Sequence, residues 1–191
     1  MANATEKLIE ELKLGSQHAQ QEMLAMYGES VWRQVTMIVA QQEDAEEVYQ
    51  DVFLKAFKAI GSYRPEQASL ATWLGRIAYN ESLNAVRKRK PPIVYVDDRD
   101  VDLESMQDET IATLQERDEQ TIELIERALD FLPPAEQAII TMFYFDNQSI
   151  KDIAYITETN ISTVCSKLSR TRKKLYRIIK KLYRIIKNIQ R

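Results

Sequence analysis

The chain of 191 residues is 45% apolar and 29% charged, so it can bury a hydrophobic core and is too apolar to be disordered. It carries 29 acidic and 26 basic residues, for a formal charge of −3, but the stretch 167–191 holds 11 of the bases and no acid. One cysteine and one histidine exclude an internal disulfide and a Cys/His zinc cluster, and the four scattered glycines exclude a phosphate-binding loop. We therefore expect no enzyme, no cofactor and no metal site.

The hydrophobic pattern is helical in almost every patterned segment, and strand-like alternation with turn dipeptides is absent. We predict an all-α protein. Its helices are expected at 5–14, 16–28, 30–41, 43–60, 69–90, 119–132, 134–145, 149–157 and from 161 onward, with serine N-caps at 16, 69 and 149. No apolar run is long enough to cross a bilayer, and the N-terminus lacks the apolar stretch of a signal peptide, which predicts a cytoplasmic protein.

The predicted helices form two groups. Pro91 and Pro92 end the fifth helix, and the stretch after them is acidic and poor in large core residues. We predict two small helical domains, 1–92 and 119–191, joined by an acidic linker at 93–118. Such a linker would let the two domains dock on separate sites.

The helix predicted at 43–60 has two different faces. One is broadly apolar and indicates packing into a core. The opposite face is acidic with one apolar residue set in it, and it consists of Asp44, Glu47, Gln50, Asp51 and Leu54. It would suit a basic helical partner, although a solvated helix with one stray leucine explains these residues equally well.

The segment 61–92 combines a polar loop with a helix that becomes basic toward its end. Polar and basic residues recur on this helix at spacings of three or four, at Arg76, Asn80, Asn84, Arg87 and Lys88. This stripe could follow a phosphate backbone, and nearby aromatic rings are what unpaired bases stack on. We expect Trp73 in the core and the loop residue Tyr63 outside it.

The segment 149–175 has the helix-turn-helix pattern: a short capped helix, a tight polar turn and a second helix with a basic outer face. That outer face carries Ser162, Ser166, Ser169, Arg170 and Lys173, flanked by Lys167, Arg172 and Lys174. Hydroxyls and guanidinium groups are side chains that contact phosphates and bases in a major groove. A structural helical hairpin with a solvated basic face is the poorer explanation, because the segment lacks acids.

Together these segments resemble the extracytoplasmic-function (ECF) sigma factors of the sigma-70 superfamily. The stretch "DAEEVYQDVFLKAF" is similar to the family's polymerase-binding helix, and "LATWLGRIAYNESLNAVRKRK" is similar to its promoter-melting helix. The stretches "LPPAEQAIITMFYFDNQSIKDIAYIT" and "VCSKLSRTRKKL" resemble its C-terminal domain, which reads the −35 element. The resemblance covers most of the chain in order.

The resemblance implies a role for each of these surfaces. The acidic face of the 43–60 helix would contact the coiled coil of the polymerase's largest subunit. The −10 strand would be opened and read at Tyr63, Arg64, Arg76 and Asn80, with residues 87–90 holding nearby phosphates. The −35 contacts would come from Cys165, Ser166, Ser169 and Arg170.

The chain departs from the family pattern in three places. Glu158 occupies the turn where the family usually has glycine, and Cys165 stands where a basic residue is common. The loop 61–69 matches poorly. In addition, the heptad "KKLYRII" is written twice, at 173–186. A duplication that lengthens the last helix is our first interpretation, ahead of a docking stripe for a regulator or second copy and ahead of a membrane-surface helix.

The sequence thus predicts an RNA polymerase sigma factor that binds core RNA polymerase and promoter DNA, with an anti-sigma factor as a possible further partner. A helix-turn-helix regulator that binds operators without polymerase is the alternative. A membrane-associated interaction protein, which would depend on the stretch 173–191, is a second rival.

Overall fold

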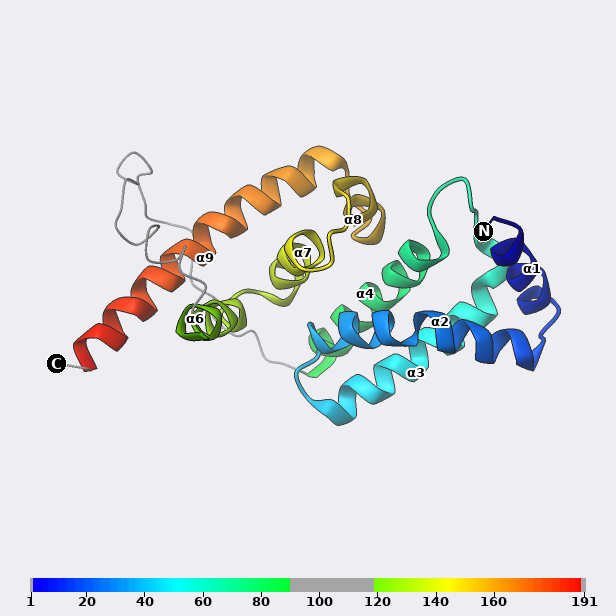
Figure 1. Cartoon of the computed structure of the whole chain (residues 1–191), viewed down its shortest axis with the longest axis horizontal. Coiled ribbons are helices and arrows are strands. Elements are labelled where there is room, and N and C mark those ends of the chain that lie inside the picture. Colours follow the sequence, from blue (N-terminus) through cyan, green and yellow to red (C-terminus); the bar gives the residue numbers. More distant parts are fainter. Residues whose placement is uncertain (1, 90–118, 190–191) are drawn as a thin grey trace.

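The computed structural model describes residues 2–89 and 119–189, and every regular element within these two ranges is a helix (Figure 1). The predicted linker at 93–118 lies outside the described residues, so the domain boundaries stay predictions. The all-α fold class is confirmed.

The first group of helices forms a bundle. It consists of α1 (Ala2–Lys13), α2 (Gln17–Thr36), α3 (Gln42–Ala59), the short 3-10 helix η1 (Ile60–Ser62) and α4 (Leu70–Arg89). Helices α2, α3 and α4 pack against one another and α1 packs on α2. Their apolar faces meet in a core that includes Met23, Val52 and Leu74.

Two of the predicted serine caps start helices in this bundle. The Ser16 hydroxyl accepts a hydrogen bond from the backbone N–H of Ala19 at 3.3 Å. The Ser69 hydroxyl accepts one from the N–H of Thr72 at 3.1 Å. Each bond satisfies an N–H that has no partner within its own helix, which is why the sequence signal was reliable here.

The predicted break between residues 28 and 30 is wrong, because α2 runs through it without interruption. Gly28 is buried in this helix, and a Cβ at its position would lie 2.7 Å from the hydroxyl oxygen of Tyr49 on α3. The glycine therefore makes room for a tyrosine of the neighbouring helix and does not end its own.

The second group of helices packs around the last one. It consists of α6 (Glu119–Asp130), α7 (Pro134–Tyr144), α8 (Ile150–Ile156) and α9 (Ile161–Ile189). Helix α9 contacts α6, α7 and α8. Ile178 and Ile179, from the first copy of the heptad, are buried, so this copy belongs to the core of the second domain.

The two domains also contact each other, mainly through α4 against α8 and to a smaller extent α7 (Figure 1). This contact brings the predicted promoter-melting helix against the first helix of the helix-turn-helix.

Candidate polymerase and DNA interfaces

The acidic face predicted on α3 (Asp44, Glu47, Gln50, Asp51 and Leu54) lies on the surface of the first domain. Asp44 is half-buried and the other four side chains are exposed. Leu54 has 54% of its surface exposed, while Val48 and Val52 on the opposite side of the helix are buried. An exposed leucine among carboxylates and an amide would suit a protein-binding surface, and a solvated helix with one exposed leucine has the same appearance.

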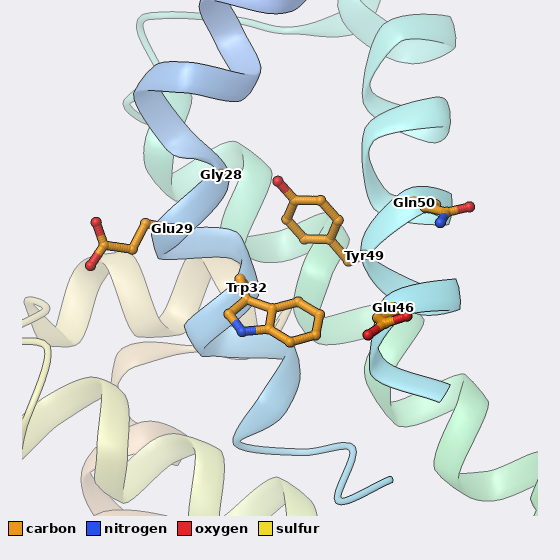
Figure 2. Close-up of a pocket in the computed structure, with 6 residues that line it drawn as sticks. All are labelled: Gly28, Glu29, Trp32, Glu46, Tyr49 and Gln50. Atoms are coloured by element: carbon orange, nitrogen blue, oxygen red, sulfur yellow. The ribbon is translucent and has the colours of Figure 1, made fainter. Parts of the chain in front are cut away.

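An open groove of about 550 Å³ adjoins this face, between α2 and α3 (Figure 2). The rings of Trp32 and Tyr49 lie between the two helices, with centroids 5.7 Å apart and an edge-to-face angle of 81°. Glu29 and Glu46 also line the groove, next to Gln50 of the acidic face. Aromatic rings flanked by carboxylates favour a cationic side chain.

Sequence reasoning missed this groove. It treated the face of the 43–60 helix that carries Tyr49 as buried and gave Trp32 no role, yet both rings are only partly buried. A tryptophan in the helix that precedes the acidic one was a usable hint. Its pairing with Tyr49, however, depends on how α2 and α3 cross, which a hydrophobic period does not reveal.

The basic stripe on α4 divides into two parts. At its C-terminal part, Asn84 and Lys88 line a small groove of about 90 Å³ together with Asp44, Glu47 and Asp51 of the acidic face. Arg87 is exposed. The side chain of residue 89 and the whole of residue 90 lie outside what the structure describes. The structure thus places part of the predicted DNA-binding stripe beside the predicted polymerase-binding face.

At its N-terminal part the stripe faces the second domain. Arg76 Nε donates a hydrogen bond to Glu158 Oε1 at 2.7 Å, and Asn80 Nδ2 lies 3.4 Å from the same oxygen. The guanidinium carbon of Arg76 also lies 5.2 Å from the centre of the Tyr155 ring. Arg76 and Asn80, two of the predicted −10 residues, are therefore in contact with the helix-turn-helix.

The expectation that Tyr63 lies outside the core is wrong. Only 4% of its surface is exposed, its ring packs edge-to-face on Trp73 at 5.5 Å, and its hydroxyl donates to the carbonyl of Ala68 at 3.0 Å. Burial is the main cause that raises the pKa of the Tyr63 phenol above 10.0, and nearby tyrosines and a glutamate raise it further. No base can stack on the ring in this arrangement. Trp73 is buried as expected, and Arg64 is exposed.

The helix-turn-helix is built as the sequence predicts. The Ser149 hydroxyl accepts from the N–H of Asp152 at 3.1 Å and caps α8, and Asn160 Oδ1 accepts from the N–H of Thr163 at 2.7 Å and caps α9. Between the two helices Glu158 adopts a left-handed backbone with φ of 54°. Glycine adopts this conformation without the steric cost that a side chain brings.

The outer face of α9 is open to solvent. Ser162, Cys165, Ser166, Arg170 and Lys173 are exposed, and Lys167 and Ser169 are half-buried. The hydroxyl of Ser166 donates to the carbonyl of Ser162 at 2.9 Å, a bond that a phosphate or base could replace. This surface, which we call the recognition face, is separate from the domain contact.

One flanking base does not belong to it. Lys174 is buried, and its ammonium nitrogen lies 3.2 Å from Glu136 Oε2 on α7. The expectation that Lys174 flanks the DNA-contacting outer face is therefore wrong, because this lysine holds α9 against α7.

Comparison with known proteins agrees with this architecture. Residues 23–91 match the model of Sigma-70 region 2, and residues 122–175 match that of Sigma-70, region 4. The chain is 30% identical over 176 residues to the ECF RNA polymerase sigma-E factor of Escherichia coli K12, covering 87% of this chain and 89% of that one. This chain belongs to the ECF sigma factors.

Two further relatives are similar over the same extent. The identity is 27% to the RNA polymerase sigma-H factor of Pseudomonas aeruginosa, over 88% of this chain and 90% of that one. It is also 27% to the ECF RNA polymerase sigma factor SigW of Bacillus subtilis, over 87% and 92%. The match therefore spans both domains of this ECF sigma factor.

Solved structures show the same fold. CnrH, determined in complex with the cytosolic domain of CnrY, superposes with a TM-score of 0.63 at 19% identity, covering 91% of this chain and 95% of that chain. The sigma factor RpoE, crystallised with the anti-sigma factor NepR from Bartonella quintana, gives 0.58 at 21%, covering 84% and 96%.

Within residues 2–89 and 119–189, no three histidine, cysteine or carboxylate side chains gather as they would around a metal ion. None of the helices that the structure describes is long and apolar enough to span a membrane.

Proposed function

We propose that this ECF sigma factor binds core RNA polymerase through the acidic face of α3. The observation that carries the proposal is the exposure of Gln50, Asp51 and Leu54 on one side of a helix whose other side is buried. A basic helix of the polymerase would find carboxylates for its cations and an apolar contact at Leu54. Such charge complementarity speeds encounter and fixes the orientation of the two partners.

The groove beside this face extends the proposed interface. A lysine or arginine of the polymerase would lie against Trp32 and Tyr49, with Glu29 and Glu46 close to its charge. Cation–π contacts contribute about 0.5–2 kcal/mol, the larger values applying when the cation loses its water. We therefore include α2 in the polymerase-binding surface.

The DNA contacts are proposed on two surfaces. The recognition face of α9 would enter the major groove of the −35 element, where Arg170 can donate two hydrogen bonds to a guanine. Arg64, Arg76, Asn80, Asn84, Arg87 and Lys88 would hold the opened −10 strand and its phosphates. Tyr63 has no part in this proposal.

The chain itself carries out no covalent step in this scheme, because the polymerase makes the bonds. Its work is to position the enzyme and to capture the opened strand, in the cytoplasm where polymerase and promoters are found. An anti-sigma factor is a further proposed partner. CnrH and RpoE, which share this fold, were each solved in complex with another protein, and the partner of RpoE is the anti-sigma factor NepR.

The interface is tested by Asp51→Arg, measured as retention of core polymerase on the immobilised sigma factor. Reversing one charge at the centre of the acidic face should weaken binding by at least tenfold, about 1.4 kcal/mol. Glu22→Arg is the matched control, because Glu22 is an exposed acid of α2 and the charge change is the same. Equal retention by the wild type and both variants would contradict the proposed interface.

A further inference from the structure

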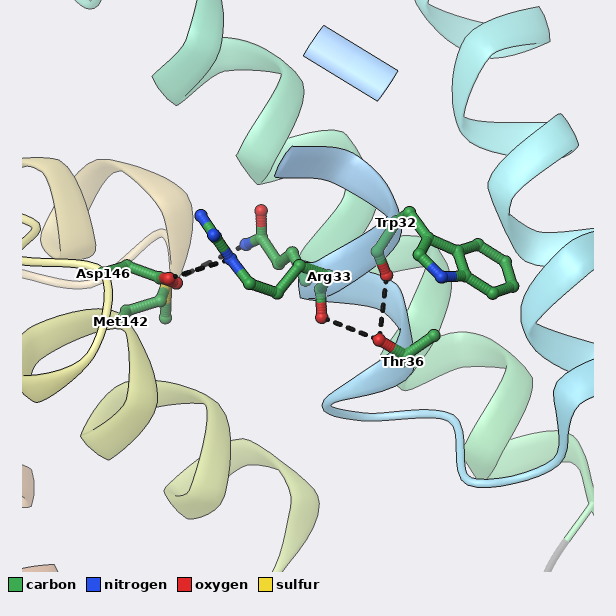
Figure 3. A network of polar contacts seen from close by, with 6 residues as sticks. Trp32, Arg33, Thr36, Met142 and Asp146 are labelled. Carbon is green, nitrogen blue, oxygen red and sulfur yellow. Dashed lines mark hydrogen bonds and ion pairs between the residues drawn. The ribbon is translucent and has the colours of Figure 1, made fainter. Parts of the chain in front are cut away.

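The domain contact is polar as well as apolar. Arg33 extends from α2 toward Asp146, in the segment between α7 and α8, and its Nε lies 3.1 Å from the Oδ1 of that residue (Figure 3). Thr72 of α4 donates to Asp152 of α8 at 3.2 Å. Two polar links therefore join the domains from two different helices of the first bundle.

A glycine allows the domains to approach closely between these links. A Cβ on Gly75 would lie 3.0 Å from Gln34 Oε1 and 3.3 Å from Ile156 Cδ1 of the second domain. Gln34 is itself buried, and its amide donates to the carbonyl of Gly75 at 3.1 Å. A side chain at this position of α4 would press on Gln34 of the same bundle and on Ile156 across the domain contact.

Glu158 completes the contact, in an unusual conformation. It holds both Arg76 and Asn80 from a turn residue with positive φ, where a side chain has a steric cost that glycine avoids. Tyr155, one turn earlier, lies against the same guanidinium. The carboxylate thus takes the place that a phosphate would occupy against this arginine and asparagine.

The domain contact involves the proposed DNA-binding residues of α4 and leaves the recognition face of α9 exposed. Arg76 and Asn80 face the second domain, whereas Ser166, Arg170 and Lys173 on α9 are exposed to solvent. In this arrangement the chain presents its recognition face but not the part of α4 that would hold an opened strand.

We propose that the α4 surface formed by Arg76 and Asn80 is a shared docking surface, occupied by Glu158 of the second domain in the free chain and by single-stranded DNA once the domains separate. The inference rests on the proposed function of α4 in strand capture. It adds a competition: capture of the strand requires the domains to part.

The ion pair between Arg76 and Glu158 is weak enough for DNA to replace the carboxylate. Arg76 and Glu158 keep 39% and 50% of their side-chain surface exposed, so solvent screens their attraction. An ion pair exposed to this degree shifts an equilibrium by about two- to fivefold. Loss of this ion pair should therefore shift the balance between joined and separated domains by about that factor.

The separation of the domains can be measured with spin labels. The one native cysteine, Cys165, is exposed on α9, and Lys58→Cys adds a second label on the exposed surface of α3. The otherwise unchanged chain should give a single narrow distance distribution by pulsed electron resonance. Glu158→Gln should add a longer and broader component, and so should Gly75→Leu, which wedges the contact without changing any charge.

The same substitutions without labels are then tested for binding to a short fluorescein-labelled DNA single strand of mixed sequence. Both variants should bind it more tightly than the wild type, by about two- to fivefold for Glu158→Gln. Asp130→Asn is the control, because it removes an equal charge from the second domain at an exposed carboxylate at the end of α6. It should leave both the distances and the affinity unchanged. Circular dichroism verifies that each variant is folded.

The outcomes separate this inference from the proposed function. A broad distance distribution in the wild type, or equal strand affinity in the wild type, Glu158→Gln and Gly75→Leu, overturns the competition. Absence of strand binding by every form overturns the proposed role of Arg76 and Asn80, and with it the competition, while core polymerase binding still tests the α3 interface on its own. Tighter binding by Glu158→Gln alone also overturns the competition, because it would report only the lost charge.

Discussion

At the residue scale, Gly28 of α2 leaves room for the Tyr49 hydroxyl of α3. A methyl group at residue 28 would lie 2.7 Å from the tyrosine oxygen, and that ring also forms one wall of the groove next to the acidic face. One glycine therefore connects the packing of the bundle to the shape of the proposed polymerase surface.

Gly28→Ala should change the free energy of unfolding differently in the Tyr49→Phe chain and in the wild-type chain. In a Tyr49→Phe chain, the hydroxyl that would clash is gone, and alanine should raise the free energy of unfolding by about 0.5–1 kcal/mol through its higher helix propensity. With Tyr49 present, the overlap should cancel this gain or reverse it. Urea unfolding of the four chains measures the difference, and an equal effect of the alanine in both backgrounds would refute the contact.

Asp146 is the buried end of an ion pair between the domains, with 9% of its side chain exposed. Burial raises the pKa of this carboxyl above 3.8, and the Arg33 guanidinium lowers it in part. The folded chain keeps this proton at pH values where the unfolded chain has lost it. The contribution of Asp146 to stability therefore falls as the pH rises from 3.8 through the raised pKa.

Replacing Arg33 with alanine should raise the pKa of Asp146 further, because the cation that favours the carboxylate is removed while the burial remains. The carbon-13 shift of the carboxyl group, followed by NMR against pH, reports this value directly. A titration at 3.8 in the wild type that does not change in the variant would show that the carboxyl is solvated and unpaired, whereas a wild-type value below 3.8 would show that the ion pair outweighs the burial.

At the element scale, the two sides of α9 differ. Its inner side carries Val164, Leu168 and the buried isoleucines of the first heptad copy, and its outer side carries the recognition face. Neighbouring lysines divide between them: Lys173 is exposed and Lys174 is buried against Glu136. The basic character of this helix is thus partly structural.

These two lysines should respond differently to alanine. Lys173→Ala should leave stability unchanged and reduce by about 1 the slope of log affinity against log salt for duplex DNA, because one phosphate contact is lost. Lys174→Ala should lower the free energy of unfolding of the second domain by about 1–2 kcal/mol, because a partly buried carboxylate loses its partner. Thermal unfolding and salt titrations of DNA binding distinguish the two variants. Equal effects of both variants on stability and on the salt slope would contradict the different positions of the two lysines.

Much of this element structure was predictable, because it depends on local signals. The serines at 16, 69 and 149 cap helices through bonds that span three residues, and the apolar period gives the faces of α3 and α9. The errors at Gly28 and Tyr63 share a cause: each residue meets a partner on another segment. A glycine that admits a neighbouring side chain and one that ends a helix look the same in sequence.

At the scale of the whole molecule, the chain presents an acidic surface on one domain and a basic recognition face on the other. The sequence predicts both surfaces, because each lies on one helix. It does not predict the contact between Arg76 and Glu158, which are 82 positions apart. Nothing in the spacing of these two residues indicates that the domains meet there, so the competition for α4 emerged only from the structure.

The central claim is that these two surfaces together direct polymerase to promoters. Run-off transcription from a library of genomic fragments, with purified bacterial core polymerase, tests it most directly. We expect the wild-type chain to yield discrete transcripts that core enzyme alone does not make, and Asp51→Arg to yield none of them. Transcripts no different from those of core enzyme alone, or an undiminished set with Asp51→Arg, would contradict the account.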